Sequence, residues 1–183
     1  MNYFNSTVIV LAIAVWYFYP VASRDISSEC DIKVEERAVR GNSLTPLARD
    51  GQKVRILFGY YDCHDIKRND IVLYSYAGSG SDSPLIKIVR AVPGDSYKLQ
   101  RANGGWHILI NGEILKNSEG VPYLVSGKKY EMLALYEPGY AVNGVNENTY
   151  LILGEIPSGA VDSTRFGFIS GSEIIAKAEL ASH

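Results

Sequence analysis

The stretch "LIKIVRAVPGD" at residues 85–95 combines a short strand-like run with a turn. Residues 85–92 form a near-continuous apolar run, and the Pro-Gly-Asp triplet at 93–95 ends it. A short run rich in Ile and Val and bounded by turn residues is typical of a buried strand. Runs of similar character occur at 53–60 and 70–77, so the sequence predicts a mainly β fold.

A hairpin follows this strand. The segment "SYKLQRANGGWHILINGEIL" at 96–115 predicts two strands joined at 103–105, with a second tight turn at 111–112. Residues 116–148 are less regular, which indicates an insert outside the core. The last segments are a strand at 149–157, a loop and short strand at 162–170, and a strand or short helix at 171–180. Many short strands separated by turns predict a β-barrel or β-sandwich core.

Length and charge limit the possible functions. The 183 residues suffice for one domain with a sizeable core. Nucleic acid is not expected as a partner, because the net charge is −2 and phosphate binding needs a clustered basic surface.

The N-terminal stretch "TVIVLAIAVWYFYPVA" at 7–22 carries no charge. Counted from Tyr3, it reaches roughly the 20 residues that a helix needs to span a bilayer. We therefore expect a transmembrane anchor over residues 1–23 and one folded domain over residues 24–183. The alternative is a cleaved secretory signal, but no Lys or Arg precedes the apolar run as such signals require.

The basic residues after the apolar stretch and the two cysteines relate to the cellular compartment of the domain, and the alternatives stay open. Four Lys and Arg residues lie between positions 24 and 40, and this bias alone would place the domain in the cytoplasm. Cys30 and Cys63 would pair in an oxidising compartment and would stay as thiols in the cytoplasm.

Lys87 is unusual because apolar residues surround it within the 85–92 run. Burial disfavours the charged form of a lysine and lowers its pKa, and a neutral amine is a competent general base. The alternative is that Lys87 points from an edge strand into water. Burial would allow Lys87 to activate a serine without any histidine.

Ser43 is the candidate serine, in the stretch "GNSLTPLARDG" at 41–51. No histidine lies within twenty residues of it. A serine before a Thr-Pro step is also common in turns, where its hydroxyl binds the backbone. The local motif alone therefore leaves a turn serine and a nucleophile as alternatives.

Several stretches occur in a distinctive order along the chain: "NSLTPLARDGQKV", "NDIVLY", "LIKIVRAVPGD", "INGEIL" and "YLILGEIPSGAVDSTRFGFIS". This order resembles the type I signal peptidase family of membrane-anchored Ser–Lys proteases, including its conjugative-transfer relatives. The family's lysine precedes the proline of Pro-Gly-Asp by six positions, and Lys87 and Pro93 keep this spacing.

The resemblance implies roles for individual residues. Ser43 would be the nucleophile, Lys87 the general base, and the Ser43 backbone N–H an oxyanion donor. A further set would support the site structurally: Pro46, Gly94, Asp95, Asp162, Ser163 and Arg165. The resemblance implies no metal and no cofactor.

The chain departs from the family pattern at several positions. Gly41 and Ala160 stand where family members often carry serines, so two hydroxyls near the site are missing. Glu155-Ile156-Pro157 replaces Asp-Asn-Arg directly after Gly154, and the segment from Asp162 to Arg165 contains an extra residue. These differences affect the residues that would orient Lys87 more than they affect the Ser43–Lys87 pair itself.

The function implied by the resemblance is a serine endopeptidase anchored in the inner (plasma) membrane, with its catalytic domain on the extracytoplasmic side. Its partners would be membrane lipid and precursor proteins, either with leader peptides cut after small residues or pilin-like. The substrate would bind as an extended strand beside the Ser43 segment. Both hydrolysis and joining of product ends remain open.

Other interpretations use different residues. One alternative is an inactive anchored β-domain that binds precursors, and another is a self-cleaving repressor-type Ser–Lys protease. A Ser43–His64–Asp triad and a Cys63–His107 thiol protease are further candidates. A metal site within "DCHD" at 62–65 is disfavoured, because the ligands are sequence neighbours and no second cluster has zinc spacing.

Overall fold

The computed structural model describes residues 30–75, 84–138 and 145–180. The expected transmembrane anchor at 1–23 lies outside the described residues. In the described ranges no helix is long and apolar enough to cross a bilayer.

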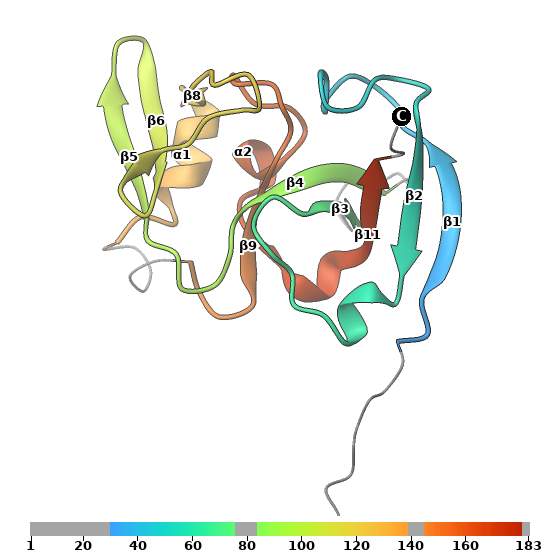
Figure 1. The fold of residues 1–183 in the computed structure, drawn as a ribbon. Coiled ribbons are helices and arrows are strands. Elements are labelled where there is room, and N and C mark those ends of the chain that lie inside the picture. Colours follow the sequence, from blue (N-terminus) through green and yellow to red (C-terminus); the bar gives the residue numbers. More distant parts are fainter. Residues whose placement is uncertain (1–29, 76–83, 139–144, 181–183) are drawn as a thin grey trace, which may run out of the picture.

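The larger sheet has seven antiparallel strands in the order β1-β2-β11-β3-β4-β9-β10. These strands are β1 (Lys33–Ala38), β2 (Lys53–Phe58), β3 (Ile71–Tyr74), β4 (Leu85–Ala91), β9 (Thr149–Leu153), β10 (Ile169–Ser170) and β11 (Ile174–Leu180). Figure 1 shows β4 and β9 at the centre of the molecule, between β1, β2 and β11 on one side and a smaller sheet on the other. The expected mainly β fold is confirmed.

The smaller sheet contains β5 (Tyr97–Ala102), β6 (Gly105–Ile110) and β7 (Glu113–Ile114), and β8 (Leu124–Val125) pairs with β6. The hairpin predicted at 103–105 is present, with Ala102 opposite Gly105. Gly104 adopts φ 82°, a left-handed value that glycine reaches without steric penalty. Strand pairing does not join the two sheets within the described residues. Their buried side chains form three clusters, one of which contains residues of both sheets.

Short helices complete the fold: η1 (Tyr60–Asp62), α1 (Lys128–Ala134), α2 (Ser163–Phe166) and η2 (Gly171–Glu173). Helix α1 lies in the insert expected at 116–148. Its Leu133 is fully buried in the core beneath the smaller sheet, so part of the insert packs as an integral element.

Strand β1 lies within the charged stretch at 24–40 and was not predicted as a strand. Most of its side chains are exposed, and within the described residues it pairs with β2 at the edge of the larger sheet. Charged side chains on an edge strand discourage pairing with other molecules. The charges of this stretch therefore protect an exposed edge of the sheet.

Candidate active site

A cleft with a volume of about 860 Å³ brings Ser43 and Lys87 into one cavity. Strand β1 and the loop after it form one wall, and the start of β4 forms another. The lining residues are 37–43, Val54, Ile56, Leu73, 84–87, Ala160 and Val161. Apolar side chains dominate this set, so the cleft is a poor environment for an unpaired charge.

Ser43 lies in a bend after β1 that several bonds close. The Gly41 N–H donates to Asp50 Oδ1 at 2.7 Å, and Gly41 adopts φ 79°. Leu44 is fully buried next to the serine and anchors the bend in the core. The carbonyl oxygen of Ser43 accepts a hydrogen bond of 2.6 Å from the N–H of Glu155, so the bend is tied to the end of β9.

Lys87 lies on β4 and is only 3% exposed. Its Nζ donates to Ser43 Oγ at 3.0 Å and to the carbonyl oxygen of Ile86 at 2.6 Å. No carboxylate forms an ion pair with it within the described part of the chain. Burial lowers the pKa of Lys87 from 10.5 to about 8, although the charge of Asp162 opposes this shift. An appreciable fraction of the amine is therefore neutral at physiological pH.

Asp162 holds the segments around Gly154 and Ala160 together with the start of α2. It is fully buried and caps α2, accepting hydrogen bonds from the Thr164 N–H at 3.0 Å and the Thr164 hydroxyl at 2.7 Å. Its other oxygen accepts from the N–H groups of Gly154 and Ala160 at 3.0 and 3.2 Å. Ser163 acts in the same region, because its Oγ accepts from the Ile152 N–H at 3.0 Å. These two residues bind the end of β9 to the start of α2.

Gly154 permits a close approach that any other residue would prevent. A Cβ at this position would lie 2.6 Å from the Ser43 carbonyl oxygen and 3.5 Å from the Ala160 Cβ. Contacts below about 3 Å require the neighbouring atoms to move. The missing side chain thus lets the end of β9 lie against the Ser43 bend.

The remaining expected support residues lie elsewhere. Gly94 turns the chain after β4 with φ 88°, and Asp95 accepts hydrogen bonds from the Val92 N–H at 2.9 Å and from Asn111 Nδ2 at 2.8 Å. Pro46 is exposed and follows a cis peptide bond. Arg165 is also exposed, and its side chain forms no ion pair within the described ranges.

The alternative catalytic groups do not meet at Ser43. His64 stacks on Tyr60, and its Nδ1–H donates to the Tyr60 carbonyl oxygen at 2.9 Å. It lies outside the residues that line the cleft. Cys63 forms a disulfide with Cys30, with the two Cα atoms 6.0 Å apart, so neither sulfur is a free thiol. His107 bonds to the carbonyl of Tyr123 at 2.9 Å. The triad and the thiol protease are therefore not supported by the geometry.

Sequence reasoning missed a buried ion pair next to this site. Arg90 on β4 pairs with Glu155, and the two residues are 8% and 1% exposed. The only signal was Glu155 itself, which stands where the family pattern has a different residue. Its partner lies 65 positions away, so no local pattern indicated the pair.

Comparisons of the sequence with known proteins identify its family. The family model "Signal peptidase, peptidase S26" matches residues 3–182. The chain is 25% identical over 149 residues to signal peptidase IB of Staphylococcus aureus strain COL, covering 76% of this chain and 72% of the relative. It is 22% identical over 148 residues to a probable signal peptidase I-2 of Synechocystis, covering 79% and 61% of the two chains.

A solved structure also matches. A signal peptidase I from Enterococcus faecalis aligns with a TM-score of 0.41 and 19% sequence identity, covering 65% of this chain and 98% of the other. The family match spans nearly the whole sequence and includes both walls of the cleft. The chain therefore belongs to the signal peptidase family, peptidase S26, and is a serine endopeptidase.

Proposed function

We propose that this protein is a membrane-anchored peptidase that cleaves leader peptides or pilin-like precursors with a Ser43–Lys87 dyad. The observation that carries this proposal is the 3.0 Å distance between Lys87 Nζ and Ser43 Oγ in a largely apolar cleft. A buried amine with a lowered pKa can take the proton of a serine hydroxyl.

The chemistry proceeds by acyl transfer. Neutral Lys87 takes the hydroxyl proton of Ser43 while the serine oxygen attacks the scissile carbonyl carbon. The lysine ammonium then returns this proton to the leaving amine as the peptide bond breaks. Water attacks the resulting ester and loses a proton to Lys87. The lysine ammonium then returns this proton to the Ser43 oxygen as the ester bond breaks, and the acid product ionises to a carboxylate. Attack by an amine in place of water would join product ends.

The oxyanion is stabilised chiefly by the backbone N–H of Ser43. This N–H donates to no acceptor among the described residues, so it is free to bind the developing negative charge. Gly41 offers no hydroxyl, and its own N–H is held by Asp50. The side chain of Asn42 also lines the cleft and carries an amide that can donate. Loss of one donor costs about 10²–10³ in kcat in other enzymes, so we expect slow turnover.

The cleft suits an extended peptide with small side chains next to the cut. Strand β9 pairs with β4 only from Ile88 onward, so one edge of residues 85–87 stays unpaired in the described structure. A substrate strand can add to this edge through main-chain hydrogen bonds. The apolar side chains of Val39 and Ile86 lie in the same cleft and limit the size of the substrate side chains there.

The disulfide and the N-terminal sequence support an extracytoplasmic position for the catalytic domain. Disulfides persist in oxidising compartments, and Cys30 and Cys63 are paired here. The apolar stretch at 7–22 would hold the chain in the inner membrane as a single span. We therefore place the catalytic domain on the extracytoplasmic side, close to the membrane lipid.

A peptidase that binds precursors and cuts them only very slowly is the second candidate. The observation that favours it is the absence of side-chain hydroxyls at Gly41 and Ala160, both of which line the cleft. Such a protein would hold a leader peptide with little cleavage of it.

Turnover of a membrane-embedded precursor with alanine before the cut separates these candidates. We expect cleavage by wild type and loss of cleavage in both Ser43→Ala and Lys87→Ala. Ser172→Ala and Lys98→Ala are matched controls, because both side chains are exposed outside the cleft. Equal cleavage by wild type and both active-site variants would reject the dyad, and binding with little cleavage by wild type would favour the second candidate. The product mass distinguishes hydrolysis from end-joining.

A further inference from the structure

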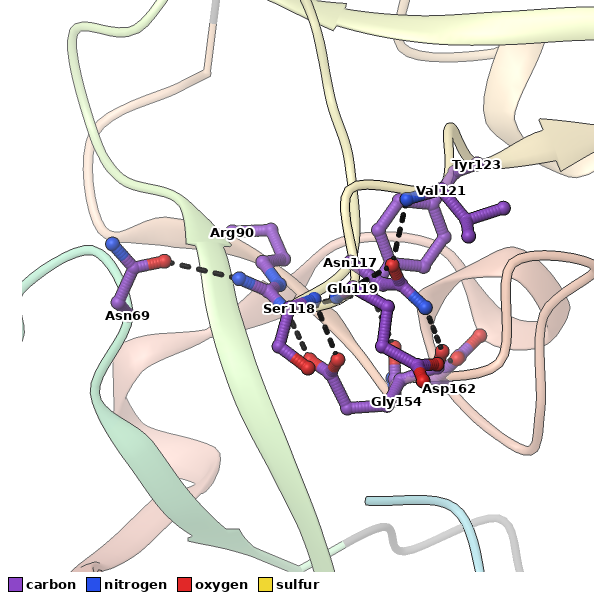
Figure 2. A network of polar contacts seen from close by, with 10 residues as sticks. Asn69, Arg90, Asn117, Ser118, Glu119, Val121, Tyr123, Gly154 and Asp162 are labelled. Carbon is purple, nitrogen blue, oxygen red and sulfur yellow. Dashed lines mark hydrogen bonds and ion pairs between the residues drawn. The ribbon is translucent and has the colours of Figure 1, made fainter. Parts of the chain in front are cut away.

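A buried polar network lies beside the cleft, around the ion pair of Arg90 and Glu155 (Figure 2). Burying two charges loses their hydration, and such pairs often contribute little to stability. Here the guanidinium is not even fully satisfied, since its Nε is buried without a hydrogen-bond partner among the described residues. The pair therefore calls for a reason beyond holding the fold together.

Glu155 is tied to three different segments through both its side chain and its backbone. Its carboxylate accepts from Arg90 on β4 and, at 2.7 Å, from the N–H of Ser118 in the insert. Its carbonyl oxygen accepts from Asn117 Nδ2 at 3.1 Å. Its N–H donates to the carbonyl oxygen of Ser43 at 2.6 Å. The position of Glu155 thus sets where the Ser43 bend is held.

The neighbouring Gly154 is fixed in the same way. The hydroxyl of Tyr123 donates to the Gly154 carbonyl at 2.6 Å, and Arg90 lies 3.5 Å from that hydroxyl. Burial raises the pKa of Tyr123 to about 12, so the hydroxyl keeps its proton for this bond. The Gly154 N–H donates to Asp162, whose charge acts on Lys87. Figure 2 shows Tyr123, Gly154 and Asp162 within this one network.

We propose that Arg90 and Glu155 are positioning residues that hold the 154–155 backbone so that Ser43 and Asp162 keep their places relative to Lys87. The network reaches into the turn at 117–123, so a segment that the sequence marks as an insert supports the nucleophile. This inference rests on the proposed function of the Ser43–Lys87 dyad. It adds a role for two residues that touch neither the substrate nor the reacting atoms.

Glu155→Gln tests the proposal, because it keeps the side-chain shape and removes the charge. One amide NH₂ must then face a donor, either Arg90 or the Ser118 N–H, so the 154–155 backbone shifts. A misplacement of about 1 Å can lower the rate about 100-fold, and we expect kcat to fall about 10- to 100-fold. KM should change less than about twofold, because Glu155 does not line the cleft and the binding surface is retained.

The pH profile gives a second readout that a purely structural role would not move. Removing the carboxylate leaves Arg90 as an uncompensated positive charge on the strand that carries Lys87. A nearby like charge disfavours the charged form of an amine, so the midpoint of kcat against pH should move down in Glu155→Gln.

Asp70→Asn is the matched control. Like Glu155, Asp70 binds a cation and accepts from a backbone N–H. It pairs with Lys177 at 3.0 Å and accepts from the Lys67 N–H at 2.9 Å. It also accepts a hydrogen bond from the Tyr61 hydroxyl at 3.1 Å. It lies outside the residues that line the cleft. We expect it to lower the melting temperature with kcat and the pH midpoint unchanged.

Tyr123→Phe keeps the test usable if Glu155→Gln does not fold, because it removes only the hydroxyl that binds Gly154. We expect its kcat to fall about 3- to 10-fold, as for one lost hydrogen bond. The proposal would be overturned if folded Glu155→Gln had the kcat and the pH midpoint of wild type. If Glu155→Gln does not fold, a wild-type kcat in Tyr123→Phe would overturn it. Ser43→Ala run in parallel identifies the source of a failure: if it cleaves like wild type, the dyad fails as well, and if it is inactive, only the positioning role fails.

Discussion

Lys87 and Arg90 are two buried cations on the same strand, and their surroundings differ. Lys87 is 3% exposed and has the Ser43 hydroxyl and the Ile86 carbonyl as partners. Arg90 is 8% exposed and has the carboxylate of Glu155. Burial lowers the pKa of Lys87 to about 8. A guanidinium stays protonated in proteins whatever its surroundings. β4 thus carries the proposed general base and an ion-paired arginine, three residues apart.

The two cations also differ in what they do for stability. Removing one partner of a buried ion pair is strongly destabilising, because it leaves an uncompensated buried charge. An unpaired buried lysine destabilises the fold as it stands, because the unfolded chain binds a proton that the folded chain binds less readily. Lys87 therefore lowers the free energy of unfolding, and it lies three residues from the ion-paired Arg90.

Lys87→Arg should have the largest effect. A guanidinium stays protonated in proteins and cannot accept the serine proton, so we expect kcat to fall about 10⁴-fold or more. Single-turnover cleavage of an alanine-ending precursor measures this, with circular dichroism to verify folding. Activity within tenfold of wild type would contradict a lysine base.

Exchanging each cation for methionine should change stability in opposite directions. Arg90→Met leaves Glu155 buried without its partner, and we expect a loss of about 3–5 kcal/mol in the free energy of unfolding. Lys87→Met removes the buried amine, and we expect a gain of about 1–3 kcal/mol at pH 7, the upper value being the energy equivalent of the pKa shift. Urea unfolding measures both, and destabilisation by Lys87→Met would contradict the assignment.

The gain in Lys87→Met should also depend on pH. The folded pKa of about 8 lies below the ordinary value of 10.5, so the unfolded chain binds more protons between these values. The stability penalty of Lys87 is therefore complete below about pH 8 and disappears as the pH rises towards 10.5. The difference between wild type and Lys87→Met should shrink over this range.

Gly154→Ala tests the contact between the end of β9 and the Ser43 bend. The added Cβ would lie 2.6 Å from the Ser43 carbonyl oxygen, so the bend must move away from Lys87. We expect kcat to fall about 100-fold. Gly41→Ala serves as a comparison variant, because a Cβ there has no atom within 4 Å. Any loss of activity in it would come from backbone strain at φ 79° and not from a steric clash. Unchanged kcat in Gly154→Ala would show that the bend adapts.

The pH dependence of wild type should be the smallest of these effects. Activity requires the neutral amine, so kcat/KM should rise through neutral pH with a midpoint at about 8 and level off above it. Each pH unit well below the midpoint lowers the rate about tenfold. An acid optimum would contradict the role of Lys87.

Much of the fold followed from local patterns. The 96–115 hairpin and the strands around 53–60, 70–77 and 85–92 were predicted because apolar periodicity and Asn-Gly turns are local properties. Strand β1 was missed, since an exposed edge strand has no buried face and hence no apolar period. Helix α1 was missed because the irregular insert gave no clear helical signal.

The candidate site was predicted in part. The resemblance placed Ser43 and Lys87 together, and the structure brings them within 3.0 Å. Asp95 and Arg165 were expected to support the site, and this stays a prediction; Asp95 holds the turn after β4, and the Arg165 side chain is exposed. The Arg90–Glu155 pair was not predicted, because each residue by itself is an ordinary charged side chain.

Strand-forming segments, turns and a lysine inside an apolar run can be identified from the amino-acid order alone, since backbone preference depends on neighbouring residues. The partner of each buried cation, a carboxylate for Arg90 and a hydroxyl for Lys87, arises only in the folded chain. Ser43 lies 44 positions from Lys87, and Glu155 lies 65 positions from Arg90. Burial and ion pairing arise only when such distant segments pack, and these two quantities set the pKa that the chemistry needs.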